Sequence, residues 1–61
     1  MWVARDKEYD LWLFTEKPVR NIFQNYWYSE EGEQIKLDCH DSNFKHITWA
    51  DEPIRVELKI V

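Results

Sequence analysis

The stretch Leu11-Trp12-Leu13-Phe14 is apolar at four consecutive positions. Side chains alternate between the two faces of a β-strand, so Leu11 and Leu13 would share one face and Trp12 and Phe14 the other. One face of such a strand is expected to join the core. The other face requires either a second covering layer or a binding partner.

A β-hairpin is predicted around this stretch. Residues 2–5 and 11–14 are apolar runs that flank the polar residues 6–10, which is typical of two antiparallel strands joined by a loop of about four or five residues. The loop lacks glycine. We therefore expect Tyr9 or Asp10 to adopt a less favourable backbone conformation.

A second hairpin is predicted further along the chain. Proline at position 18 interrupts the preceding strand, because it removes a backbone donor and restricts the residue before it. Residues 25–28 and 34–38 then flank residues 29–33, where Gly32 occupies a position suited to a positive φ angle. This pattern predicts that residues 25–28 pair with residues 34–38.

The C-terminal residues alternate regularly. Four aliphatic residues are separated by single charged residues, which predicts a half-buried strand opened by Pro53 at its first position. These aliphatic residues are Ile54, Val56, Leu58 and Ile60. Before this strand, Asp41-Ser42-Asn43 predicts a single helical turn or an irregular loop.

No linker, repeat or composition change divides the chain, so residues 1–61 are expected to form a single small β domain. The predicted fold class is all-β, with about five short antiparallel strands in a meander or a small SH3-like barrel. At most one helical turn is expected, near residues 40–46. The predicted core consists of Leu11, Leu13, Trp27, Ile35, Leu37, Trp49, Ile54, Val56 and Leu58.

Charge and cysteine content restrict the partners and the compartment. The 12 acidic and 8 basic residues give a net charge of −4, and Arg5, Lys7, Lys17 and Arg20 form only a thin basic cluster, so direct nucleic-acid binding is not expected. The single cysteine cannot form an internal disulfide, which favours a cytoplasmic location. The start of the chain predicts neither a signal peptide nor a membrane span.

The residue types suited to catalysis or metal binding have structural explanations. Cys39, His40 and His46 are possible zinc ligands, but adjacent residues of an extended chain point to opposite faces. Ser29 and Ser42 lie in a predicted turn and a predicted cap. We therefore expect no metal site, no cofactor and no enzymatic activity.

The aromatic residues support a sharper hypothesis. With the predicted core filled, Trp12, Phe14, Tyr26 and Tyr28 are candidates for a partly exposed aromatic patch, with Trp27 facing the opposite way from the tyrosines. Such a patch favours a non-enzymatic module that binds a protein partner. A second hypothesis is a homodimer formed through the patch or through an edge strand ending at Val61. In a third interpretation, residues 38–49 or closure of a barrel simply bury both faces of the strand at residues 11–14.

Five stretches of the chain are also similar to a known group of proteins. They are residues 2–7, residues 11–14 with Lys17 and Pro18, residues 35–38, Phe44, and residues 48–53 with residues 56–58. Together they resemble a family of small uncharacterised proteins from phages, prophages and mobile elements of gut bacteria. The resemblance implies a cytoplasmic accessory protein of a mobile genetic element, without an established biochemical role.

Overall fold

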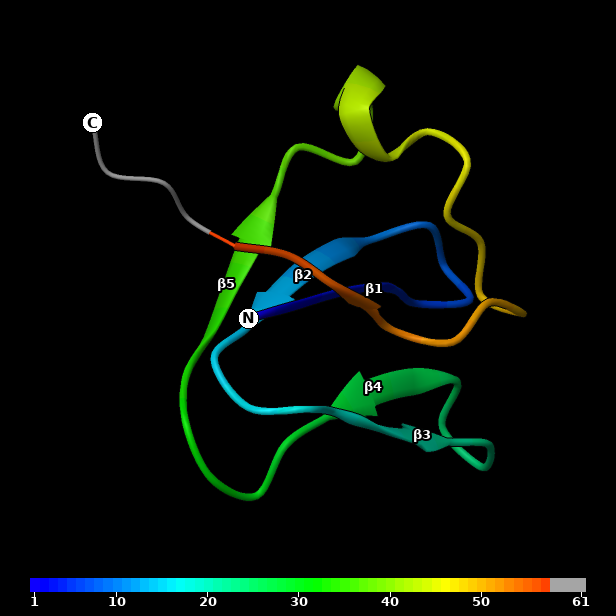
Figure 1. Ribbon diagram of the computed structural model, residues 1–61. Helices are drawn as coiled ribbons and strands as arrows, with labels where there is room; N and C mark the ends of the chain where they lie inside the picture. Colours follow the sequence, from blue (N-terminus) through cyan, green and yellow to red (C-terminus); the bar gives the residue numbers. More distant parts are fainter. Residues whose placement is uncertain (58–61) are drawn as a thin grey trace.

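The computed structural model describes residues 1–57 and shows an all-β fold, as predicted (Figure 1). These residues form six short strands and a single 3-10 turn, arranged in two antiparallel sheets. The elements are β1 (Trp2–Arg5), β2 (Leu11–Phe14), β3 (Val19–Asn21), β4 (Tyr26–Tyr28), β5 (Gln34–Leu37), η1 (Ser42–Phe44) and β6 (Ile54–Arg55).

The larger sheet has the order β5-β2-β1-β6. The first predicted hairpin is confirmed, because β1 pairs with β2 from Trp2↔Phe14 to Arg5↔Leu11. Its loop closes through the Asp6 N–H, which donates to the Asp10 carbonyl at 2.8 Å. The expected unfavourable backbone conformation falls on Tyr9, whose φ angle is 79°.

The second predicted hairpin is wrong. β4 pairs with β3 in a separate two-stranded sheet, and β5 pairs with β2. Residues 29–33 therefore connect the two sheets instead of closing a hairpin, so the sheet order departs from an uninterrupted meander. Gly32 has the expected positive φ of 80°, and a Cβ atom there would overlap the hydroxyl of Thr15.

Both faces of the larger sheet are covered. Val3 and Leu11 are buried on one face with Ile47 of the irregular segment 38–53. The side chains of Ala4 and Phe14 are buried on the other face with Trp27 of the β3–β4 hairpin. Figure 1 shows the hairpin and η1 on opposite sides of β1 and β2. This arrangement explains why residues 11–14 are apolar on both faces.

Most of the predicted core is confirmed. Leu11 and Trp27 are buried, and Leu13, Leu37, Trp49, Ile54 and Val56 pack around them partly buried. The prediction that Ile35 belongs to the core is wrong. This residue remains 51% exposed because β5 lies at the edge of the sheet. Leu58 lies outside the described residues.

The C-terminal strand is shorter than predicted. β6 ends at Arg55, where β1 supplies no further strand residue, and the Val56 N–H donates to the Met1 carbonyl at 2.8 Å. The part of the predicted strand beyond residue 57 lies outside the described residues. The predicted helical turn is confirmed, since Asp41 accepts the Asn43 N–H at 2.9 Å and caps η1.

Candidate functional site

Arg5 places a cation inside the protein, because only 2% of this residue is exposed. Its Nε donates to the Ile47 carbonyl at 2.6 Å, and its Nη2 donates to the Phe44 carbonyl at 3.1 Å. The Nη1 atom donates to the carbonyls of Tyr9 and Cys39 at 2.9 and 3.0 Å. A guanidinium carries five N–H donors, so these bonds use most of them. The buried charge is thus stabilised by backbone dipoles.

Arg5 also holds the irregular segment against the sheet. Cys39, Phe44 and Ile47, which supply three of its acceptors, all belong to residues 38–53, a segment that has little regular structure of its own. Arg5 shares a strand face with Val3, and this spacing directs its side chain to the core. Placing Arg5 in a basic surface cluster is therefore wrong.

The β3–β4 hairpin is fastened to the first hairpin through Asp6. One carboxylate oxygen accepts the backbone N–H of Trp27 at 2.9 Å, and the other accepts the indole N–H of Trp12, also at 2.9 Å. The indole N–H of Trp27 donates to the Arg5 carbonyl at 2.9 Å, and the Lys7 N–H donates to the Asn25 carbonyl at 3.2 Å. Three of these hydrogen bonds fix β4 and the adjoining turn to the β1–β2 hairpin, and the bond from Trp12 holds the Asp6 carboxylate in place.

Arg20 fastens the other strand of the hairpin. Its Nη2 donates to the carbonyls of Trp49 and Asp51 at 2.9 and 3.1 Å. Its guanidinium lies 4.7 Å from the Trp27 ring centroid and 5.1 Å from that of Trp49, within cation–π range. Because Arg20 pairs with Trp27 across the hairpin, both side chains lie on its inner face.

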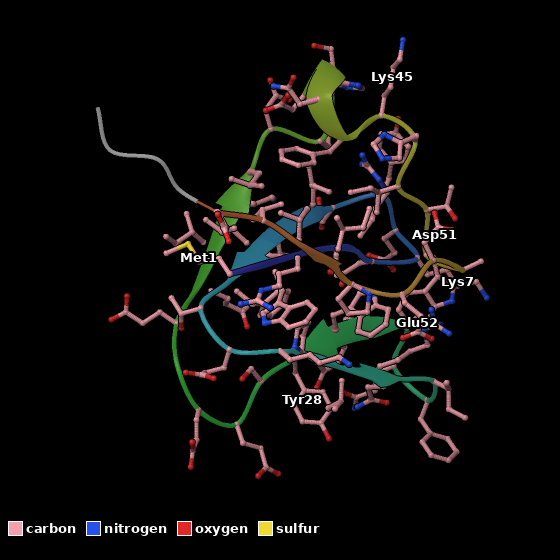
Figure 2. The ribbon with its side chains drawn as sticks, viewed as in Figure 1. Met1, Lys7, Tyr28, Lys45, Asp51 and Glu52 are labelled. Carbon is pink, nitrogen blue, oxygen red and sulfur yellow. The ribbon has the colours of Figure 1, made fainter. Side chains whose placement is uncertain are left out.

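The outer face of the hairpin is apolar and faces away from the larger sheet. Val19 pairs with Tyr28, so these side chains share the face opposite Arg20 and Trp27, as does Tyr26. The rings of Tyr26 and Tyr28 lie edge-on to each other, with 6.1 Å between their centroids. Figure 2 shows Tyr28 on the side of β4 away from β1 and β2. We call the outer face and the adjoining tip the hairpin surface, which comprises Val19, Ile22, Phe23, Tyr26 and Tyr28.

The tip of the hairpin presents its apolar side chains to solvent. Phe23 is 90% exposed and Ile22 is 67% exposed. The side-chain oxygen of Asn21 accepts the N–H groups of Phe23 and Gln24 at 3.0 and 3.1 Å, and the Asn25 N–H donates to the Asn21 carbonyl at 2.9 Å. Asparagine also tolerates the positive φ of 62° at position 25. The turn is therefore held by its own hydrogen bonds while its apolar side chains remain free.

The four residues of the predicted aromatic patch separate into two groups. The expected exposure of Phe14 is wrong, because the hairpin covers that face of β2 and leaves Phe14 0% exposed. Trp12 is half-buried against the same cluster, and its indole N–H is bonded to Asp6. Tyr26 and Tyr28 lie half-buried on the outer face of the hairpin, opposite Trp27, as expected.

Sequence analysis missed Ile22 and Phe23 as surface residues. The available signal was Asn21 followed four residues later by Asn25, a pair of residues that favour turns. Such a turn places the intervening apolar side chains at its tip.

A shallow hollow adjoins the hairpin surface. Its volume is about 380 Å³, and it is lined by Lys17, Val19, Tyr28, Ser29 and Glu30. It opens broadly to solvent. Two further carboxylates, Glu31 and Glu33, follow Glu30 in the loop after β4, so this loop is acidic.

The polar cluster at residues 38–41 caps turns. The carboxylate of Asp38 accepts the His40 N–H at 2.9 Å, while Asp41 caps η1. Within residues 1–57, no three side chains of histidine, cysteine, aspartate or glutamate are grouped so that they could hold a metal ion. Cys39 is a free, half-buried cysteine whose carbonyl accepts from Arg5.

A scan against models of protein families found no match for the chain, and searches of curated proteins and of solved structures found none either. Among the helices of residues 1–57, none has the length and apolar character needed to cross a membrane.

Two carboxylates have pKa values displaced in opposite directions. Burial raises the pKa of Asp6 above its ordinary value of 3.8, although donation from Trp27 and Trp12 opposes the change. Donation from the N–H and hydroxyl of Thr48, at 2.8 and 3.1 Å, lowers the pKa of Asp51 below the same ordinary value.

These displacements predict opposite pH effects for Asp6→Asn and Asp51→Asn. A raised pKa means that Asp6 contributes stability below pH 3.8, which is lost as the pH rises through the folded-state pKa. Asp51 contributes stability above pH 3.8, which is lost as the pH falls through its lowered pKa. Urea unfolding between about pH 2.5 and pH 6 measures both effects. As the pH rises, the free energy of unfolding of wild type should fall relative to that of Asp6→Asn. Relative to that of Asp51→Asn, it should increase. Slopes of the same sign would contradict these assignments.

Proposed function

We propose that this protein is a non-enzymatic interaction module that binds a protein partner through the hairpin surface. The observation that carries the proposal is the exposure of Ile22 and Phe23 on a turn fixed by Asn21. Exposed aromatic side chains that enter a partner's pocket supply much of the binding energy in protein interfaces. The partner's pocket receives the tip, and Tyr26 and Tyr28 extend the contact along β4.

The attachment of the hairpin supports this role. Trp27 donates to Arg5 and Asp6, the Lys7 N–H donates to Asn25, and Arg20 donates to Trp49 and Asp51, so hydrogen bonds fix the hairpin to the rest of the protein. A surface already ordered before binding loses less conformational entropy when the complex forms. The hairpin surface is therefore suited to binding without rearrangement of its backbone.

Charge points to the chemistry of the partner. The chain carries a net charge of −4, and Glu30, Glu31 and Glu33 lie in the loop that follows β4. We propose that the partner has an apolar pocket bordered by basic groups, since complementary charges fix orientation and raise association rates. The single cysteine supports action in the cytoplasm, and the sequence resemblance suggests the accessory machinery of a phage or another mobile element.

Affinity capture with matched variants tests the proposal. The tagged wild-type protein should retain one partner from a lysate of its host cell. Phe23→Ser should bind this partner at least about tenfold more weakly, which corresponds to about 1.4 kcal/mol of binding free energy, and should retain correspondingly less of it. Because Phe23 is 90% exposed, its replacement should change the free energy of unfolding by less than about 0.5 kcal/mol. Capture is measured by quantitative mass spectrometry.

Ile35→Ser is the matched control, because Ile35 is also an exposed apolar residue but lies on β5, outside the hairpin surface. This variant should capture as much partner as wild type. Equal capture by Phe23→Ser and wild type would contradict the proposed binding surface.

A further inference from the structure

β5 is an edge strand of the larger sheet. Within residues 1–57, no strand pairs with its outer side (Figure 1). Gln34, Ile35 and Lys36 are exposed, and Ile35 is an apolar residue on an otherwise polar stretch. An open edge presents backbone donors and acceptors that can pair with another strand.

The hydrogen-bond alternation fixes which residues of β5 face the open side. The Thr15 N–H donates to the Glu33 carbonyl at 3.0 Å, so the backbone groups of Glu33 are directed toward the strand that contains β2. Along an antiparallel strand, the backbone groups of successive residues are directed alternately inward and outward. The backbone groups of Ile35, two residues after Glu33, are therefore directed toward β2 as well. The N–H and C=O groups of Gln34 and Lys36 therefore point outward.

We propose that a second copy of this chain pairs antiparallel with the outer edge of β5, about a two-fold axis at Ile35. In this register Gln34 of each copy lies opposite Lys36 of the other, so the outward backbone groups of both residues are paired. Ile35 lies opposite its own counterpart at a non-hydrogen-bonded position, where the side chains of antiparallel strands approach most closely. The sheets of the two copies would form one continuous sheet.

The segment itself argues for a second copy. Pairing about Ile35 satisfies the outward donors and acceptors of Gln34 and Lys36 and buries the exposed side chain of Ile35. The same three residues supply both sides of this two-fold interface. A shift of the axis to Lys36 would place two lysines directly opposite each other, which is destabilising. The Lys36 ammonium lies 3.6 Å from the Asp10 carboxylate, so it is held over the chain's own sheet. This interface contains no residue of the hairpin surface and does not depend on the proposed function.

Sedimentation equilibrium between about 1 µM and about 1 mM tests the dimer. We expect wild type to become dimeric within this range. The variant Lys36→Pro removes only an outward N–H, so every bond between β2 and β5 is kept. Proline is tolerated at such a position, where the edge of a strand faces solvent. Its dimer should be at least about tenfold weaker, a change of about 1.4 kcal/mol. Ile35→Lys should weaken it similarly by placing like charges opposite each other.

Val19→Lys on the hairpin surface is the control and should dimerise as wild type does. Amide exchange supplies an independent readout, since the Lys36 N–H should exchange more slowly as dimer forms, while the Ile35 N–H is protected at every concentration. The proposal is overturned if wild type is monomeric at about 1 mM or if Val19→Lys abolishes the dimer. It is also overturned if a dimer forms with no change in Lys36 exchange, or if it is unaffected by both β5 variants.

Discussion

Replacing Arg5 with Met should remove a large part of the domain's stability at room temperature. The substitution removes the donors from the Ile47, Phe44 and Cys39 carbonyls that hold residues 38–53 against the sheet. Each buried acceptor left without a partner costs about 1–3 kcal/mol, so the loss should be at least about 3 kcal/mol. A domain of this length is stabilised by only about 3–9 kcal/mol in total. Urea unfolding followed by far-ultraviolet circular dichroism measures the loss.

Two matched variants separate the role of hydrogen bonding from that of charge. Arg5→Lys keeps the cation but has three donors in a different geometry, so it should still lose about 2 kcal/mol. Arg55→Met removes the same side chain from an exposed position on β6 and should change stability by less than about 0.5 kcal/mol. A stable Arg5→Met variant, within about 1 kcal/mol of wild type, would show that residues 38–53 are held by apolar packing alone.

Trp27→Ala is the second change with a large expected effect. Trp27 is the buried side chain through which the β3–β4 hairpin covers Ala4 and Phe14. Its ring lies edge-on to that of Trp49, with 5.8 Å between the ring centroids. Its removal should cost about 3–5 kcal/mol, because a large cavity opens between the two sheets. The hairpin would lose the part of its attachment that depends on the Trp27 side chain, so partner capture should fall together with stability.

Trp27→Phe tests the hydrogen bond apart from the packing. Phenylalanine retains an aromatic ring but removes the indole N–H that donates to the Arg5 carbonyl. This variant should be destabilised by about 1–3 kcal/mol, less than Trp27→Ala. Both losses are measured by urea unfolding with circular dichroism. Equal stability of wild type and Trp27→Ala would contradict the placement of this side chain between the sheets.

Local sequence patterns predicted the parts of the fold that depend on neighbouring residues. The β1–β2 hairpin has its strands separated by only five residues, and η1 is capped by Asp41 within its own turn. The pairing of β5 with β2 could not be predicted in the same way, because about twenty residues separate the two strands. It is supported by the paired contacts of Thr15 with Glu33 and by the close approach of Gly32 to Thr15, none of which leaves a periodic pattern.

The candidate site was predicted in part. Tyr26 and Tyr28 lie on one face of a strand with Trp27 on the other, as alternation requires. Alternation relates the residues within one strand only and does not say which face another element covers. This is why Phe14 was assigned to the surface, although the hairpin buries it. Likewise, the exposure of Phe23 depends on the turn that Asn21 closes.

The most direct test of the hairpin surface is site-specific photocrosslinking. A photoreactive aromatic amino acid is placed at position 23, at the tip, or at position 45, where exposed Lys45 lies next to η1 on the opposite side of the larger sheet (Figure 2). Both proteins are irradiated in a host lysate, and crosslinked products are identified by mass spectrometry. We predict one dominant crosslinked protein from position 23, competed by unlabelled wild type, and no such product from position 45. Equal products from both positions, or none from position 23 in a folded protein, would contradict binding through the hairpin.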